Sequence, residues 1–125
     1  MEDALDPFEE GLSTEVFECA QQSAIVVVAR GELDSQTVSE LNEAVNDALS
    51  RPATRRVVLD LDGIVFFGSA GVAFLTQAES DARARSIELR LVVPPTSRVH
   101  RVLEVMGLIR LMALYPTRDE ALSAD

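Results

Sequence analysis

The chain has 125 residues, a formal net charge of −10 and 47% hydrophobic residues. This length is typical of one domain with a single core, and the composition is that of a globular protein. The acidic balance excludes an electrostatic attraction to phosphate, so we expect a protein partner and no nucleic acid. All 11 basic side chains are arginines, which removes lysine-based Schiff-base chemistry and a phosphate-loop lysine.

The N-terminal end differs in character from the rest of the chain. Residues 1–12 are acidic, contain Pro7 and Gly11 and show no periodicity, so we predict an acidic flexible leader before a single domain over residues 13–125. The leader lacks the basic and apolar regions of a secretory signal, and no apolar run reaches the ~20 residues of a membrane span. We therefore expect a cytoplasmic protein with no membrane partner.

Two strands are predicted at the start of the domain. Apolar and polar residues alternate over residues 14–20, and residues 24–30 form a β-branched run that is ended by Gly31. The single cysteine, Cys19, lies in the first strand and is expected to be a buried structural thiol facing the core, with redox sensing as the alternative.

A first helix follows these strands. Thr37 and Glu40 have the spacing of a capping box, and apolar residues recur at helical intervals up to Leu49. Pro52 ends the helix because proline cannot continue the hydrogen-bond ladder. The run over residues 57–61 then predicts a short buried strand.

The next segment contains a second helix between two strands. Residues 62–68 are predicted as a loop, residues 69–85 as a helix with one apolar face, and residues 87–93 as a buried strand. Parallel strands that are joined by helices indicate an α/β fold.

The C-terminal part repeats the pattern. Ser97 is expected to cap a third helix that ends at Gly107, residues 109–115 to form the last strand, and Thr117 with Glu120 to cap a closing helix. The order is ββαβαβαβα, which predicts a mixed, mostly parallel sheet packed with helices, whose first strand is free to pair antiparallel.

The loop before the second helix is the most informative segment. Ser69 lies at or next to the N-cap, where a phosphate would meet free backbone N–H groups and the positive end of the helix dipole. Gly68 and Gly71 would leave the backbone open to another protein. Phe66 and Phe67 point to opposite sides of an extended segment, so one of them is expected at the surface. The alternative for Ser69 is that it only caps the helix.

Three kinds of chemistry fit the sequence poorly. A hydrolase elbow needs a glycine two residues before Ser69, and the only histidine, His100, falls on the polar side of a helix. An aspartyl-phosphate receiver needs a lysine near the phosphorylated aspartate, and this chain has no lysine. Asp60 and Asp62 without further ligands make a poor metal site, so solvated or capping roles are expected for them. We predict no enzyme activity, metal or cofactor.

The order of several motifs resembles that of the STAS-domain anti-sigma factor antagonists of bacteria, over roughly residues 13–122. The matching segments are Gly31-Glu32-Leu33-Asp34, Val58-Leu59-Asp60-Leu61-Asp62-Gly63-Ile64-Val65-Phe66, Ser69-Ala70-Gly71-Val72, Glu88-Leu89-Arg90-Leu91-Val92 and residues 99–108. The resemblance implies the STAS fold and a protein that binds an anti-sigma factor, itself an ATP-binding serine kinase, and so releases a sigma factor.

The resemblance also implies a switch. The kinase would phosphorylate Ser69, which weakens binding, and a phosphatase would reverse it; added negative charge within a docking surface repels a matched partner. The family's partner surface would include Glu32, Asp34, Ala70, Gly71 and Val72. We add the neighbouring Phe67 and Gly68 to this predicted partner surface.

Two departures from the family pattern leave an alternative open. Gly68 stands where the family commonly has aspartate, and Ala70 replaces a common serine or threonine. The alternative function is a non-phosphorylated STAS interaction subunit of a stress-signalling or lipid-transport complex.

Overall fold

A computed structural model describes residues 11–124. They contain a five-stranded sheet, four α-helices and two short 3₁₀ helices, in the predicted order ββαβαβαβα. The elements are β1 (Leu12–Cys19), η1 (Ala20–Gln22), β2 (Ala24–Leu33), α1 (Val38–Ser50), β3 (Arg56–Phe67), α2 (Ser69–Ala84), β4 (Glu88–Val92), α3 (Arg98–Val105), η2 (Ile109–Leu111), β5 (Ala113–Tyr115) and α4 (Arg118–Ser123). None of the helices in this part of the chain is long and apolar enough to cross a bilayer.

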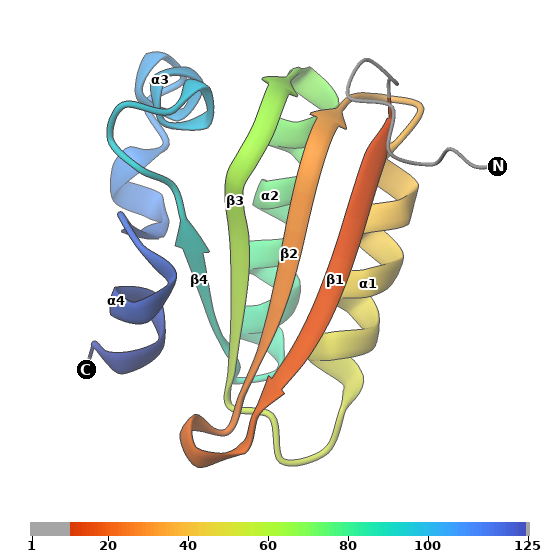
Figure 1. The fold of residues 1–125 in the computed structure, drawn as a ribbon, viewed down its shortest axis with the longest axis vertical. Coiled ribbons are helices and arrows are strands. Elements are labelled where there is room, and N and C mark those ends of the chain that lie inside the picture. Colours follow the sequence, from red (N-terminus) through yellow and green to blue (C-terminus); the bar gives the residue numbers. More distant parts are fainter. Residues whose placement is uncertain (1–10, 125) are drawn as a thin grey trace, which may run out of the picture.

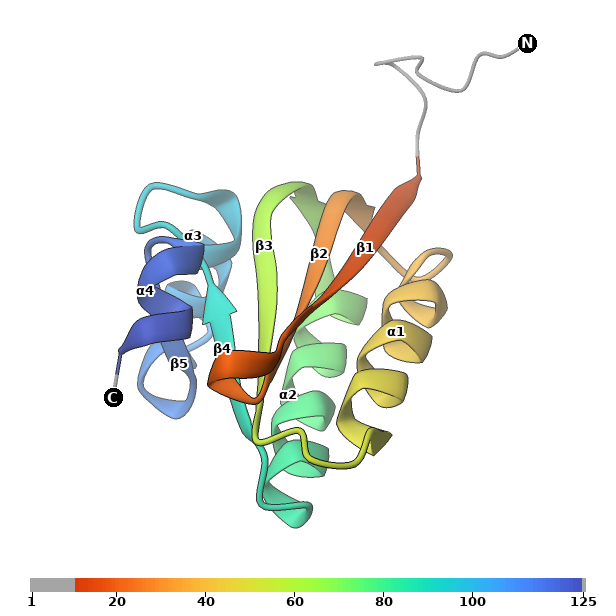
Figure 2. The same ribbon diagram turned by 60° about the horizontal axis from the view of Figure 1, so that its bottom comes forward.

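The strands follow one another across the sheet in sequence order, from β1 at one edge to β5 at the other. β1 pairs antiparallel with β2, and the other neighbours are parallel, as predicted. α1 and α2 lie side by side on one face of the sheet, and α3, β5 and α4 gather at the side far from β1 (Figures 1 and 2). The C-terminal ends of β2 and β3 therefore meet at one end of the molecule, next to the start of α2.

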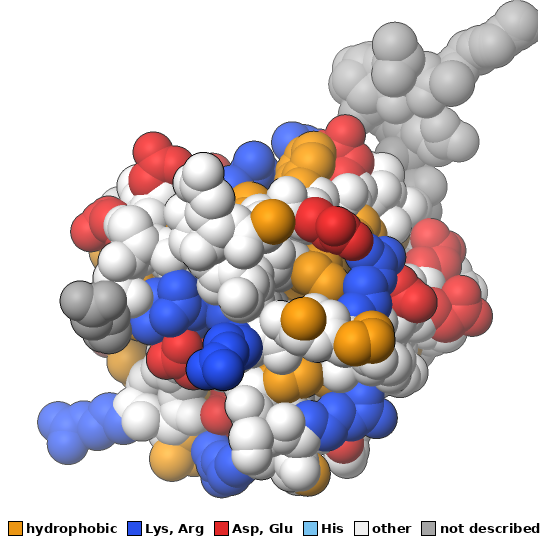
Figure 3. Space-filling model, turned by 90° about the horizontal axis from the view of Figure 1, so that it is seen from below, with side chains coloured by type: hydrophobic (Ala, Val, Ile, Leu, Met, Phe, Trp, Pro, Cys, Tyr) orange, Lys and Arg blue, Asp and Glu red, His pale blue; other side chains and the backbone are white. Residues whose placement is uncertain are grey.

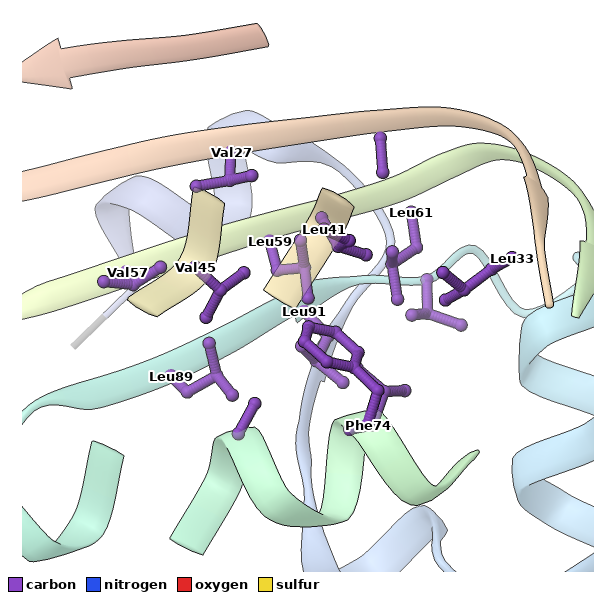
Figure 4. Packing of buried hydrophobic residues seen from close by; sticks show 14 of the residues in the cluster. Val27, Leu33, Leu41, Val45, Val57, Leu59, Leu61, Phe74, Leu89 and Leu91 are labelled. Carbon is purple, nitrogen blue, oxygen red and sulfur yellow. The ribbon is translucent and has the colours of Figure 1, made fainter. Parts of the chain in front are cut away.

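The main core lies between the sheet and α1, α2 and α3. Alternate residues of the central strands point into it because successive side chains of a strand face opposite sides. Val27, Leu59 and Leu91, from three neighbouring strands, face Val45 of α1 and Phe74 of α2 (Figure 4). A smaller cluster on the other face is covered by α4 through Ala121.

Two strands are longer than predicted. β2 continues through Gly31 to Leu33, and β3 continues from Leu61 to Phe67, so the predicted loop over residues 62–68 is mostly strand. The two extensions pair with each other across two register shifts, which bend the strands without ending them. Gly31 has φ +111, and the carbonyl of Gly11 leaves no room for a Cβ there, so this glycine permits a bulge and does not end the strand.

The helix caps agree with the sequence at three places out of four. Ser97 accepts a hydrogen bond from the His100 amide, Thr117 accepts one from the Glu120 amide, and Gly107 follows α3 with φ +74. The capping box predicted at Thr37 is wrong: its hydroxyl donates to the Glu32 carbonyl at 2.7 Å and caps no amide of α1.

The last strand is shorter than predicted, since only Ala113–Tyr115 is extended and Ile109–Leu111 forms η2. The turn after α3, closed by a hydrogen bond from the Leu108 amide to the Leu103 carbonyl, leads directly into η2. Only the last three residues of β4 have a partner in β5. The length of β5 therefore follows from how many residues of β4 it can pair with, and not from how many apolar residues the segment contains.

The N-terminal boundary and Cys19 differ from the predictions. Residues 1–10 of the predicted leader lie outside the described residues, whereas Leu12 already belongs to β1, so this strand begins one residue before the predicted boundary at Ser13. Cys19 is only partly buried. It packs against the smaller core cluster, as a core-facing residue would, but it is not fully buried because β1 is the edge strand. The prediction of a buried thiol is therefore wrong in the extent of burial.

Arginines fasten α4 to the sheet. Arg90, which is 1% exposed, donates to the carbonyls of Ala121 and Ala124 at the end of α4, and Arg56 donates to that of Leu122. Both also bind Glu88. Burial alone would raise the pKa of Glu88, but the hydrogen bonds from Arg90 and Arg56 outweigh it and lower this pKa below its ordinary value.

Candidate functional site

Ser69 is the first residue of α2 and is exposed. Gly68 precedes it as the N-cap residue, and the Gly68 carbonyl accepts hydrogen bonds from the amides of Gly71 and Val72. The Ser69 hydroxyl makes no capping hydrogen bond to α2, so the interpretation that this serine only caps its helix is wrong. Among the described residues, the first two amides of α2, those of Ser69 and Ala70, have no backbone acceptor, so the hydroxyl lies where an added anion would be stabilised.

The two loops at this end of the sheet are connected. The Gly68 amide donates to the Leu33 carbonyl at 3.2 Å, which ties the end of β3 to the end of β2. Beyond Leu33, the Asp34 carboxylate accepts hydrogen bonds from the amides of Gln36 and Thr37 at 2.9 and 3.1 Å. Asp34 thus shapes its own loop, and a second carboxylate oxygen is left for other contacts.

Gly71 is a packing glycine. It is buried, and a Cβ placed on it would lie 2.7 Å from the ring of Phe67 and 3.1 Å from a methyl group of Leu33. Phe67 is 5% exposed and belongs to the core. Phe67 and Gly71 therefore position the start of α2. The prediction that both belong to the partner surface is wrong, because both residues are buried.

The accessible phenylalanine is Phe66. It is 47% exposed, its neighbour Val65 is 63% exposed, and in the register of the sheet Phe66 lies opposite Glu32. A Cβ on Gly68 would lie 3.1 Å from the Phe66 ring, so this ring lies across the N-terminus of α2. The sequence indicated one exposed phenylalanine but gave no signal for Val65, whose exposure results from the register shifts.

These residues form one surface at the C-terminal ends of β2 and β3. Of the sequence-predicted partner residues, Glu32, Asp34, Gly68, Ala70 and Val72 are half-buried, which leaves part of each accessible. Together with Ser69 and the exposed Val65 and Phe66, they form what we call the Ser69 surface. It consists of Glu32, Asp34, Val65, Phe66, Gly68, Ser69, Ala70 and Val72.

The residues considered for other chemistry lie apart from this surface or are already paired. Asp60 is 6% exposed and forms an ion pair with Arg118 at 2.9 Å, so it is neither solvated nor free to act as a ligand. His100 is half-buried on α3, although the sequence indicated a polar, solvent-facing side. Within residues 11–124, no three metal-ligating side chains cluster.

The opposite end of the molecule has a different surface. Figure 3 shows this end, where basic and acidic side chains are interspersed around small hydrophobic areas. Arg51 binds both Asp47 and Glu18 at 2.9 Å there, and Arg56 binds Glu88 at 3.1 Å. The charges of this end are therefore partly neutralised.

Comparisons with known proteins agree with this fold. The model of the STAS domain matches residues 18–121. An anti-sigma-F factor antagonist, RsfA, of Mycobacterium tuberculosis is 31% identical over 103 residues, which are 82% of this chain and 80% of that protein. An anti-sigma F factor antagonist of Paenibacillus polymyxa is 27% identical over 82% of this chain and 86% of its own length.

A solved structure is similar over nearly the whole chain. The crystal structure of an anti-sigma factor antagonist from Mycobacterium paratuberculosis superposes with a TM-score of 0.75 and 27% identity, covering 91% of this chain and 93% of that one. Proteins of this kind are regulatory binding proteins, which confirms the prediction that the chain is not an enzyme. The chain belongs to the STAS-domain family of anti-sigma factor antagonists.

Proposed function

We propose that the protein binds an anti-sigma factor through the Ser69 surface and thereby releases a sigma factor. The anti-sigma factor would be an ATP-binding serine kinase that phosphorylates Ser69 and so ends the complex, and a phosphatase would restore it. The observation that carries this proposal is the exposed Ser69, which has no capping role and directly follows Gly68, next to which the exposed ring of Phe66 lies.

The surface has the composition of a docking site. Val65 and Phe66 are large, exposed and apolar. Glu32 lies beside Phe66 at the end of β2, and Asp34 lies on the loop that follows. Exposed aromatic side chains at the centre of a patch contribute much of the binding energy in protein interfaces. We therefore expect Phe66 to enter a pocket of the partner.

Phosphorylation would change this surface strongly. A phosphoserine adds about 1.5 to 2 negative charges, which the first amides of α2 can stabilise in the free protein. The same charge would have to lose its water on binding and would add to the charges of Glu32 and Asp34. Binding is weakened because the free form gains stability while the complex loses it.

A capture experiment tests the proposal. The tagged full chain retains its anti-sigma factor from a lysate of its native host, identified by mass spectrometry, whereas the Ser69→Glu and Phe66→Ala variants lose at least about 90% of it, a tenfold change. Ser80→Glu is the matched control, because Ser80 is exposed on the same helix and receives the same charge. Equal retention by Ser69→Glu and Ser80→Glu would contradict the proposed switch.

Incubation with that kinase and ATP then locates the modification. Phosphate on Ser69 in the wild type, and none in the Ser69→Ala variant, is the expected result. Phosphate at another residue would refute the assignment of Ser69.

A second candidate retains binding without phosphorylation, as a STAS interaction subunit of a stress-signalling or lipid-transport complex. It is favoured by Gly68, which supplies no side chain beside Ser69, and by Val65 and Phe66, whose docking needs no phosphate. A kinase-free complex from the host that retains Ser69→Glu but not Phe66→Ala would support this candidate over the first.

A further inference from the structure

β1 is a long edge strand with an open side. Within residues 11–124 it pairs only with β2, so the backbone N–H and C=O groups on its outer side have no partner in the sheet. Figure 1 shows β1 at the edge of the sheet. Its residues from Ser13 to Glu18 are all exposed, including Val16 at 40% and Phe17 at 42%. The other edge strand, β5, has only three residues. β1 is therefore the edge that can accept another strand.

The charges on β1 do not protect this edge. Charged side chains on edge strands usually oppose strand addition. Here Glu15 forms an ion pair with Arg30 of the adjacent strand at 3.0 Å, and Glu18 forms one with Arg51 after α1 at 2.9 Å. Both carboxylates are thus held by the chain's own arginines, which lowers their repulsion of an incoming strand.

The faces of β1 limit how a second β1 can pair with it. Val16 lies on the helix-covered face, since its partner is Val27, and Phe17 lies on the other face, opposite Val26. In an antiparallel pair of strands, opposite residues point to the same face of the sheet. Because faces alternate along a strand, each residue must therefore lie opposite one that is an even number of positions away. In a twofold-symmetric pair, the residue midway between them then lies on the axis, opposite its own copy.

Only one register suits both charge and length. With Glu15 on the axis, two like charges would face each other, which is destabilising. With Phe17 on the axis, only the segment from Glu15 to Cys19 would be paired. With Val16 on the axis, the segment from Ser13 to Cys19 is paired throughout, Glu15 faces Phe17 and Thr14 faces Glu18. No like charges are then opposite each other.

We propose that a second copy of this chain docks antiparallel on the outer side of β1, with Val16 on the twofold axis, to make one continuous sheet. A second copy is the occupant because the strand is complementary to itself in this register, as an isologous interface requires. The interface is small, which places it among weak and transient dimers. The Ser69 surface is built on β2, β3 and α2 and does not include β1.

Sedimentation equilibrium of the full chain under reducing conditions tests the proposal. The wild type dimerises reversibly, and Val16→Lys raises the dissociation constant at least about tenfold because two lysines meet at the axis. Thr14→Lys is the matched control. Thr14 is exposed on the same face of the same strand, but its lysine would face Glu18 of the second copy, so dimerisation stays equal or becomes tighter.

Cross-linking tests the register. In a Cys19→Ser background, Val16→Cys is expected to oxidise to a disulfide-linked dimer, since residues on the axis lie within disulfide distance. Thr14→Cys is not, because its two copies are offset along the strands. A wild type that stays monomeric up to about 1 mM, equal weakening by both lysines, or equal cross-linking at both cysteines would each overturn the proposal.

Discussion

Replacement of Gly71 by alanine tests how tightly the start of α2 is packed. The new methyl group would lie 2.7 and 2.8 Å from two ring atoms of Phe67 and 3.1 Å from a methyl group of Leu33. Phe67 and Leu33 are 5% and 0% exposed, so neither can move into solvent. Overpacking of this kind costs about 1 to 3 kcal/mol, and the higher helix propensity of alanine returns at most about 1 kcal/mol. We expect a net loss of about 1 to 2 kcal/mol in the free energy of unfolding.

Urea unfolding followed by circular dichroism measures this loss, with Gly68→Ala as the matched control. A Cβ on Gly68 meets only the edge of the Phe66 ring, at 3.1 Å, and this ring is half-exposed and can rotate away. Since Gly68 has φ −101, alanine fits its backbone, and the expected change is within about 0.5 kcal/mol. A Gly71→Ala variant as stable as the wild type, or a Gly68→Ala variant equally destabilised, would refute the reasoning.

Three further variants address other parts of the structure. Ser69→Glu is expected to raise the free energy of unfolding by about 0.3 to 1 kcal/mol through the helix dipole, seen as a higher melting temperature at low salt; a lower one would contradict the geometry at α2. Arg90→Met leaves the carbonyls of Ala121 and Ala124 without their donor, so we expect a loss of about 1 to 3 kcal/mol and faster hydrogen exchange in α4. Arg30→Met, at an exposed ion pair, changes stability by less than about 1 kcal/mol. Because the pKa of Glu88 is lowered by folding, its contribution is present above the ordinary value of 4.5 and is lost as the pH falls through the lowered one. Acid titrations of wild type and Glu88→Gln should therefore converge at low pH, and curves that stay parallel would contradict this sign.

The sequence predicted the features that depend on local signals. The order of strands and helices follows from hydrophobic periodicity, and the caps at Ser97 and Thr117 use residues three positions apart. The place of Ser69 at the start of a helix was predictable for the same reason, because a glycine-punctuated segment separates an apolar strand from a helical pattern. These features need no knowledge of distant contacts.

The remaining features depend on pairings between distant segments. The extension of β3 to Phe67 exists because β2 continues beside it, and the register shifts decide that Phe66 is exposed and Phe67 buried. Alternation alone indicates only that the two side chains differ. Thr37 failed as a cap because its hydroxyl found the Glu32 carbonyl, a competitor that lies outside the helix.

The pairing of β3 also has a consequence for how the surface can respond to a partner. Among the described residues, β4 pairs with β3 only as far as Asp60, so beyond that residue the sheet narrows to a ribbon in which β3 pairs with β2 alone. Val65 and Phe66 lie on this ribbon. The flanking residues Ile64 and Phe67 are buried in the main core and anchor this ribbon, whereas Val65 and Phe66 are exposed. Substitutions at these two positions can therefore alter how the surface fits a partner while the interior stays intact.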